Sequence, residues 1–214
     1  MKLSYFRNEN IGLYFFTNDR VTIAPPALPE KDAEAIGRRL GTKVVRTEVC
    51  GSDFIGIYCA GNNNGIIIPE MATKEEAGSI EGVEVFQIRS RANAFGNNIA
   101  ANSKVALVGP VYNSKEKEAI RDALDVEVIE VDLAGYPTVG SLIRMNDTAF
   151  LLGYKAEEEI DHLKEILGME GKAGSVNMGS PIIKLGCVVN NKAYIAGSAC
   201  SGVEIGTMEE VFML

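Results

Sequence analysis

Five asparagine-centred turns recur along the chain at nearly constant spacing, and this repeat restricts the fold more than any other feature of the sequence. The steps between successive turns are 44, 40, 44 and 44 residues, a period typical of repeat architectures. Asparagine tolerates positive φ and hydrogen-bonds to neighbouring backbone, so each position suits the tip of a β-hairpin. The turns centre on Asn18, Asn62, Asn102, Asn146 and Asn190. The sequence therefore predicts five copies of one structural unit.

The pattern around each turn indicates the content of the unit. A glycine stands six residues before the turn in four copies, as Gly12, Gly56, Gly96 and Gly140, and Lys184 takes that position in the fifth. Short apolar runs flank each turn and predict the two strands of a hairpin. Helical segments follow at 30–40, 74–80, 115–124 and 157–167, and then an exit strand, as in "VEVFQI" and "VEVIEV". Each unit therefore reads as ββαβ.

Two capping boxes are expected in these helices. Thr73 with Glu76 has the required spacing, and so has Thr207 with Glu210 near the end of the chain. The second pair places the last helix within "TMEEVF" and leaves no room for an exit strand after it.

The last copy is therefore incomplete. It spans 182–214, whereas residues 1–10 belong to no other copy, and together the two segments amount to almost one period. We expect residues 1–10 to supply the missing strand and to close the units into a ring, which leaves no unpaired ends. The prediction is a single domain of class α+β. Its repeats are 11–53, 54–94, 95–137, 138–181 and 182–214 plus 1–10.

Composition restricts the environment and the chemistry. The chain has 46% apolar residues but no run of eighteen, and its start lacks the pattern of a secretory signal, so we expect a cytoplasmic protein without a membrane anchor. There are four cysteines without a C-x-x-C pair and one histidine, which argues against a metal site or any cofactor. We expect buried, reduced thiols, and a disulfide is the alternative.

The formal charge is −8 with a pI near 4.9. An acidic chain is not expected to bind DNA or to have a surface devoted to contacts with nucleic-acid phosphates, because such contacts need Lys and Arg. The acidity predicts a basic partner surface, or it serves only to keep the protein soluble.

The whole chain resembles the translation initiation factor 6 family in its archaeal form. The resemblance is carried by the fivefold period, "NAFGNNIAANSKVALVGP" from Asn93 to Pro110, "PTVGS" from Pro137 to Ser141, "GSVNMGS" from Gly174 to Ser180 and the ending "EEVFML". It implies the pentein fold, a five-bladed α/β propeller of ββαβ units.

The resemblance also implies a function without catalysis. Members bind the large ribosomal subunit on its intersubunit face, prevent association with the small subunit and accompany large-subunit maturation. The implied partners are ribosomal proteins near the sarcin–ricin loop, with a minor rRNA contact to which Arg89 and Arg91 are candidates. A solvated arginine pair is the alternative for these two, and a monomer is expected.

The predicted ribosome-binding residues come from the segments that begin each hairpin. Glycine allows close backbone approach, and Asn or Ser offers uncharged hydrogen bonds, although such residues can also serve only to turn the chain. The period places Gly12, Gly56, Gly96 with Asn97, Gly140 with Ser141, and the stretch from Ser175 to Ile182 in these segments, and the resemblance to the family's binding face implies the same segments. The set is Gly56, Gly96, Asn97, Gly140, Ser141, Ser175, Asn177, Gly179, Ser180 and Ile182.

Two alternatives are open at this stage. The pentein fold also occurs in hydrolases that attack guanidino carbons with a cysteine nucleophile, for which Cys200 and His162 are the only candidates here. We expect His162 on the outer, polar side of its helix, out of reach of such a thiol. The second alternative is a ring-shaped binding module for another partner. No G-x-x-x-x-G-K-[ST] motif for a nucleotide is present.

Overall fold

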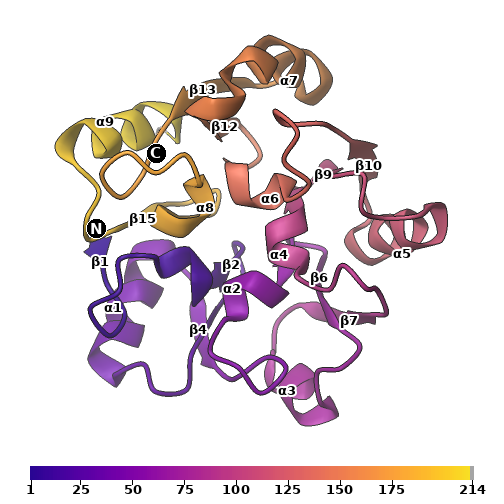
Figure 1. Cartoon of the computed structure of the whole chain (residues 1–214). Coiled ribbons are helices and arrows are strands. Elements are labelled where there is room, and N and C mark those ends of the chain that lie inside the picture. Colours follow the sequence, from indigo (N-terminus) through magenta and orange to yellow (C-terminus); the bar gives the residue numbers. More distant parts are fainter. Residues whose placement is uncertain (213–214) are drawn as a thin grey trace.

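The computed structural model describes residues 1–212 and shows a mixed α/β protein whose five three-stranded sheets surround a common axis (Figure 1). Met213 and Leu214, which end the last predicted repeat, lie outside the described residues. Outer helices cover the sheets on the side away from the axis. Within the described part, no helix combines the length and apolar character that a membrane crossing requires.

All five sheets share one topology. An antiparallel hairpin supplies two strands, and a third strand pairs in parallel with the second strand of the hairpin. The hairpins are β2 (Phe16–Thr17) with β3 (Val21–Ala24), β5 (Ala60–Gly61) with β6 (Gly65–Pro69), β8 (Ile99–Ala101) with β9 (Val105–Val108), β11 (Ile143–Met145) with β12 (Ala149–Gly153), and β14 (Cys187–Val189) with β15 (Tyr194–Gly197). The third strands are β4 (Lys43–Arg46), β7 (Glu84–Ile88), β10 (Glu127–Glu130), β13 (Glu170–Gly174) and β1 (Lys2–Leu3).

The N-terminal strand completes the last sheet, as expected from the sequence. Lys2 pairs with Ala196 and Leu3 with Gly197, in parallel register. The first and last units also touch elsewhere, because the guanidinium Nε of Arg39 donates a 3.2 Å hydrogen bond to the carbonyl of Tyr194. Within residues 1–212 no sheet closes on itself, so the five units meet through contacts between separate sheets.

The outer helices lie close to their predicted positions. They are α1 (Glu30–Leu40), α3 (Lys74–Ser79), α5 (Ser114–Leu124), α7 (Ile160–Leu167) and α9 (Gly202–Val211), with the 3-10 segment η2 (Tyr154–Glu159) before α7. The helix predicted at 157–167 therefore begins as 3-10 helix and becomes α-helical only at Ile160. The capping box of Thr73 and Glu76 is confirmed, with both hydrogen bonds present.

The predicted capping box of Thr207 and Glu210 is wrong. The helix begins earlier, and Ser201 forms the capping box with Glu204. Thr207 lies inside the helix, where its hydroxyl donates to the carbonyl of Val203 at 3.1 Å. The same S/T-x-x-E spacing occurs twice in this segment, and the buried carboxylate of Glu204 favours the first.

The apolar core is divided between neighbouring units. Every residue of the second strand of each hairpin is buried. In one cluster Val21 and Ile23 of β3 pack with Ile66 and Ile68 of β6, all fully buried. Full burial of such a side chain stabilises the fold by about 1.5 to 3 kcal/mol, so each sheet depends on its neighbour for much of its stability.

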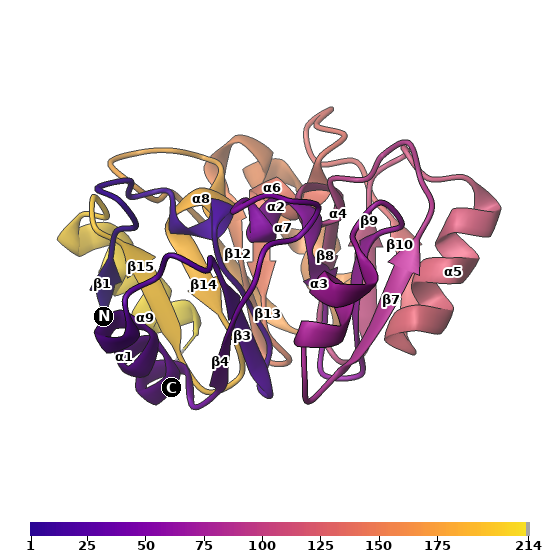
Figure 2. The same cartoon turned by 90° about the horizontal axis from the view of Figure 1, so that it is seen from below.

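The two ends of the assembly differ (Figure 2). The five asparagine turns lie at one end, which we call the asparagine end. The opposite end, here the loop end, carries a short helix at the start of each hairpin and the segments that lead into it. The second strands of all the hairpins run from the asparagine end to the loop end.

Candidate functional site

Five single helical turns at the loop end carry Gly56, Gly96, Asn97, Gly140 and Ser141 of the predicted site, whereas the stretch from Ser175 to Ile182 lies just before the fifth turn. The turns are η1 (Ile11–Leu13), α2 (Ile55–Tyr58), α4 (Phe95–Asn98), α6 (Val139–Leu142) and α8 (Ile183–Gly186). The sequence pattern did not predict helical structure in these segments. Backbone bonds such as Cys59 N to Ile55 O, at 2.8 Å, close each turn just before the chain enters the first hairpin strand. Four residues carry too little periodicity for such a turn to be recognised in the sequence.

The glycines allow these turns to pack tightly against one another. A Cβ atom on Gly56 would lie 2.1 Å from the carbonyl oxygen of Gly12, and one on Gly96 would lie 2.0 Å from that of Gly56. A Cβ on Gly140 would lie 2.3 Å from the carbonyl oxygen of Ile99. Because each obstacle is backbone, no side-chain movement relieves it. Glycine is therefore required at these positions by packing.

The predicted contact residues fall into two groups. Gly56, Gly96, Gly140 and Ser141 are buried. Asn97, Ser175, Asn177, Ser180 and Ile182 are partly buried, and Gly179 is exposed. The structure brings neighbouring members together, since the hydroxyl of Ser141 lies 3.4 Å from the carbonyl oxygen of Asn97. Their role in binding stays a prediction.

The segment before α8 is shaped by one carboxylate. Glu204 accepts hydrogen bonds from the hydroxyl of Ser175 and from the backbone N–H of Gly179, both at 2.8 Å, and of Met178 at 3.2 Å. Burial alone would raise the pKa of Glu204, but these bonds and one from the Ser201 N–H outweigh it and lower the pKa to about 2. The charged carboxylate therefore holds this loop in place.

The backbone of this loop has an uncommon conformation. Asn177, Met178 and Gly179 have φ values of 48°, 64° and 101°, and positive φ is disfavoured for the two residues that have a Cβ. The Glu204 bonds offset that strain, and they leave the side chain of Met178 77% exposed. Asn177 also links the loop to the first unit, because its Nδ2 donates to the carbonyl of Glu9 at 3.1 Å.

Exposed apolar side chains gather at the loop end. Of the large apolar side chains that are exposed in residues 1–212, all but Met1 belong to segments at this end. They are Phe6, Phe54, Met71, Val111, Tyr154, Met178 and Val203. Sequence reasoning missed this set, although a signal existed, because each is a large apolar residue beside turn-forming or charged residues.

Two of these residues belong to an aromatic row that crosses from the first unit to the second. The ring of Tyr5 lies 4.6 Å from that of Phe6 and 4.9 Å from that of Tyr14, whose ring is in turn 5.5 Å from Phe54. Burial and the nearby carboxylate of Asp53, which accepts from the Tyr5 hydroxyl at 3.3 Å, raise the pKa of Tyr5 to about 12. The buried Tyr5, held by Asp53, therefore fixes the position of the aromatic row.

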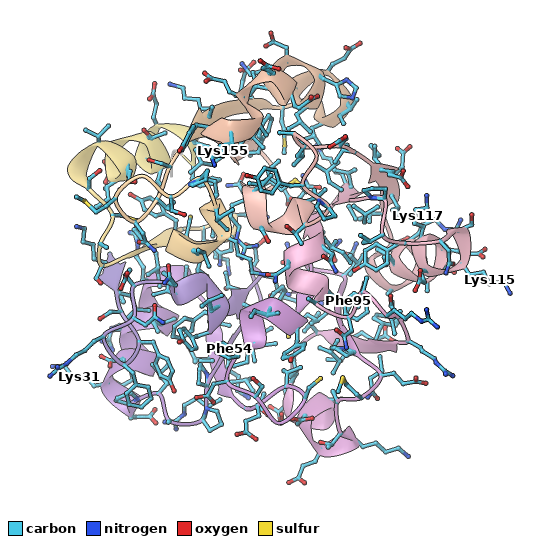
Figure 3. The ribbon with its side chains drawn as sticks, in the orientation of Figure 1. Lys31, Phe54, Phe95, Lys115, Lys117 and Lys155 are labelled. Atoms are coloured by element: carbon cyan, nitrogen blue, oxygen red, sulfur yellow. The ribbon has the colours of Figure 1, made fainter. Side chains whose placement is uncertain are left out.

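Charged groups surround this apolar surface. Figure 3 looks onto the loop end and shows Phe54 and Lys155 within its outline, whereas Lys31 and Lys115 project outward from the rim. Arg89 lies 3.8 Å from the carboxylate of Glu70, and both side chains are largely exposed. Arg91 is exposed as well. Both arginines are thus solvated and accessible.

The residues required for a hydrolase are not brought together. Cys200 is buried, and burial raises the pKa of its thiol despite a hydrogen bond from the Asn177 backbone. Its other polar contacts are the side chain of Asn177 and the carbonyl of Gly186. His162 is exposed on α7, as predicted, and no hydrogen bond within residues 1–212 joins it to Cys200. All four cysteines are free, with Cys50 partly and the others fully buried.

Comparison with known proteins gives a consistent result. The family model described as "eIF-6 family" matches residues 1–211. Translation initiation factor 6 of Pyrobaculum aerophilum is 34% identical over 209 residues, which cover 96% of this chain and 95% of that protein. The protein of the same name from Methanoculleus marisnigri is 36% identical over 207 residues, covering 96% of this chain and 94% of the relative. The chain belongs to the eIF-6 family.

Proposed function

We propose that this protein is a translation factor that binds the large ribosomal subunit on its intersubunit face and sterically prevents association with the small subunit. The proposal rests on the family and on the name that the relatives carry. The observation that carries it is the gathering of exposed apolar side chains on the loop end, which we assign as the docking surface. The same resemblance supports a part in large-subunit maturation and a cytoplasmic location.

We further infer that the five units form one domain closed into a pentein ring, with the repeat boundaries given above. Contacts between the first and last units support this inference. β1 pairs with β15, and the side-chain amide of Asn190 donates to the carbonyl of Asn18 at 3.0 Å. A ring of this kind presents a rigid platform, so little conformational entropy is lost on binding.

The composition of the loop end suits a protein interface. Interface cores are enriched in aromatic residues and Met, and exposed apolar patches on soluble proteins mark interaction sites. Phe6, Phe54 and Met178 fit that description. The net charge of −8 favours basic ribosomal proteins as the main partner, and Arg89 and Arg91 are available for a minor rRNA contact.

The proposed mechanism requires only that the factor occupies the intersubunit face, and it involves no catalysis. If the factor binds only free large subunits, it shifts the association equilibrium by RT ln(1 + [L]/Kd), about 2.7 kcal/mol when free factor is a hundredfold above Kd. An interface of standard size, roughly 1,600 Å², is sufficient for such binding. Shape and position therefore account for the proposed activity.

Sucrose-gradient sedimentation with purified archaeal subunits tests the proposal. We expect the protein to migrate with large subunits, to be absent from joined ribosomes, and to reduce the joined fraction when added before mixing. Failure to migrate with large subunits at low salt would refute the proposed function.

Two variants test the docking surface separately. Phe54→Asp and Met178→Asp should each weaken binding about tenfold or more, because a charge replaces an exposed apolar anchor. Gly78→Asp is the matched control, since it adds the same charge on outer helix α3, where a Cβ has open space. If Phe54→Asp and Met178→Asp bind large subunits as tightly as Gly78→Asp does, the loop end is not the docking surface, even if the wild-type protein binds large subunits.

A further inference from the structure

A small cavity lies on the axis of the protein, between the helical turns of the loop end and the asparagine turns. Its walls are mainly the first hairpin strands β2, β5, β8, β11 and β14, so all five units contribute. The cavity measures about 50 Å³. A buried water needs about 10 to 15 Å³ on this measure, so the space admits a few waters or one small ion with water.

One basic side chain, that of Arg144, lines this cavity, and a second, that of Lys184, lies next to it. Lys184 replaces the repeat glycine in the fifth unit and is only 1% exposed. Its ammonium Nζ donates to the carbonyl of Gly56 and lies 2.6 Å from where a Cβ on Gly96 would be. Gly96 is itself part of the cavity wall. The amino group of Lys184 therefore lies beside Gly96, next to the cavity rather than in its wall.

Arg144 lines the cavity from β11. Its Nε donates to the carbonyl of Cys187 at 3.3 Å, and the guanidinium has no other hydrogen-bond acceptor among the described residues. A guanidinium has five N–H donors, so four of them are left for whatever occupies the cavity.

No carboxylate among the residues that line the cavity balances this positive charge. The wall contains no Asp or Glu. The acidic candidates nearby are the thiols of Cys59 and Cys187, and burial raises the pKa of both, that of Cys187 to about 12. Both thiols are therefore neutral at pH 7. The cavity therefore carries positive charge without a counter-ion from its wall.

An unpaired charge in such a place is unfavourable, and a protein relieves it by neutralising the group or by binding a counter-ion. Burial, and secondarily Arg144, hold the pKa of Lys184 well below its usual range, with Cys59 acting weakly in the opposite direction. Burial also lowers the pKa of Arg144, but only to about 10, so the guanidinium stays charged at pH 7. Deprotonation of Lys184 alone would therefore leave one positive charge in the cavity.

We propose that the axial cavity is a binding site for a small inorganic anion of the chloride class, held by the free N–H groups of Arg144 and favoured electrostatically by the protonated amino group of Lys184 nearby. The size of the cavity excludes organic anions such as gluconate. The bound anion neutralises the axis, and its removal leaves uncompensated charge among the five packed units. The anion is therefore a structural ligand that stabilises the folded chain.

Crystals of the full chain grown in sodium bromide give the direct test. An anomalous bromide peak beside the Arg144 guanidinium, within the cavity, is the expected result. A cavity that contains only water, with bromide confined to the outer surface, would overturn the proposal. Arg144→Met crystals should lack the axial peak, and a peak of unchanged height in that variant would also overturn it.

Thermal unfolding at pH 7 and constant ionic strength supplies a measurement in solution. When chloride replaces gluconate, the wild-type Tm should rise by about 3 to 5 °C for each tenfold increase in chloride above Kd. Arg144→Met and Lys184→Met should each lose this dependence. Lys31→Met is the matched control, because Lys31 projects from the rim, and it should keep the wild-type dependence (Figure 3). Equal chloride dependence in all four proteins would mean general ionic effects and would overturn the proposal.

Discussion

The side-chain amide of Asn18 donates a 2.7 Å hydrogen bond to the backbone carbonyl of Asn62, forty-four residues further along the chain. The same relationship recurs from Asn62 to Asn102, from Asn102 to Asn146 and from Asn190 back to Asn18. Each Asn Oδ1 meanwhile accepts from its own turn, as Asn62 does from the N–H of Asn64 and Gly65. The five buried asparagines thus both shape the hairpins and connect neighbouring units.

One member of this set differs and provides a matched test. Asn62 Nδ2 donates to two carbonyls, those of Asn102 and Leu124, whereas the buried Nδ2 of Asn146 has no partner within residues 1–212. Asn62→Ala should therefore lower the free energy of unfolding by about 1 to 3 kcal/mol more than Asn146→Ala. Urea denaturation measures both. Equal losses would show that the connection between units contributes nothing beyond the local turn.

A glycine pair tests the packing of the helical turns. Gly56→Ala should destabilise the protein by about 1 to 3 kcal/mol or more, because the new Cβ would lie 2.1 Å from the Gly12 carbonyl oxygen. Gly78→Ala makes the same chemical change inside α3, where nothing lies within 4 Å, and should stabilise by about 0.5 to 1 kcal/mol. Thermal unfolding distinguishes the opposite signs. A Gly56→Ala protein as stable as wild type would contradict the close packing.

Protonation of Glu204 at low pH should weaken the hydrogen bonds that hold the segment before α8. The folded pKa of about 2 lies below the unfolded value of 4.5, so the carboxylate contributes stability above about pH 4.5. That contribution, roughly 3 kcal/mol, is lost progressively as the pH falls from about 5 towards 2. Urea denaturation across this range should show a smaller pH dependence in Glu204→Gln. Glu210→Gln, at an exposed ion pair with Lys172, should retain the wild-type profile.

Thiol labelling separates the binding function from the hydrolase alternative. Burial, with a lesser effect of Glu76, raises the pKa of Cys50 to about 11, so its thiolate is about a hundredfold scarcer at pH 7 than in a free cysteine. The other three thiols are fully buried. The native protein should therefore label slowly, at Cys50 first, and urea should expose all four cysteines. Rapid labelling of native Cys200 would favour the hydrolase.

Much of the fold follows from signals that lie within a few residues of one another. The Asn turns, the alternating strands, four of the outer helices and the Thr73 cap were all predictable, because hairpin tips and caps depend on local hydrogen bonds. The start of the last helix was not. Thr207 and Ser201 offer the same cap spacing, and only the burial of Glu204 against the loop distinguishes them.

Less of the candidate site could be predicted from the sequence. The repeat glycines were recognised, but their role in packing depends on a neighbouring carbonyl some forty residues away, as between Gly56 and Gly12. The exposed Phe54 and Met178 were missed because an isolated apolar residue in a loop has no period to reveal which way it faces. Their common location became evident once the five units were placed around one axis.

The sequence alone determined the number of units, the chemistry of each hairpin tip and the need for residues 1–10 to complete the last sheet, because all three follow from register along the chain. Tertiary structure decided which side chains reach the next unit, which apolar residues stay exposed at the loop end, and that the buried Lys184 lies next to the axial cavity that Arg144 lines. Those outcomes depend on distances between residues far apart in the chain, and these distances are set only when the five units pack together.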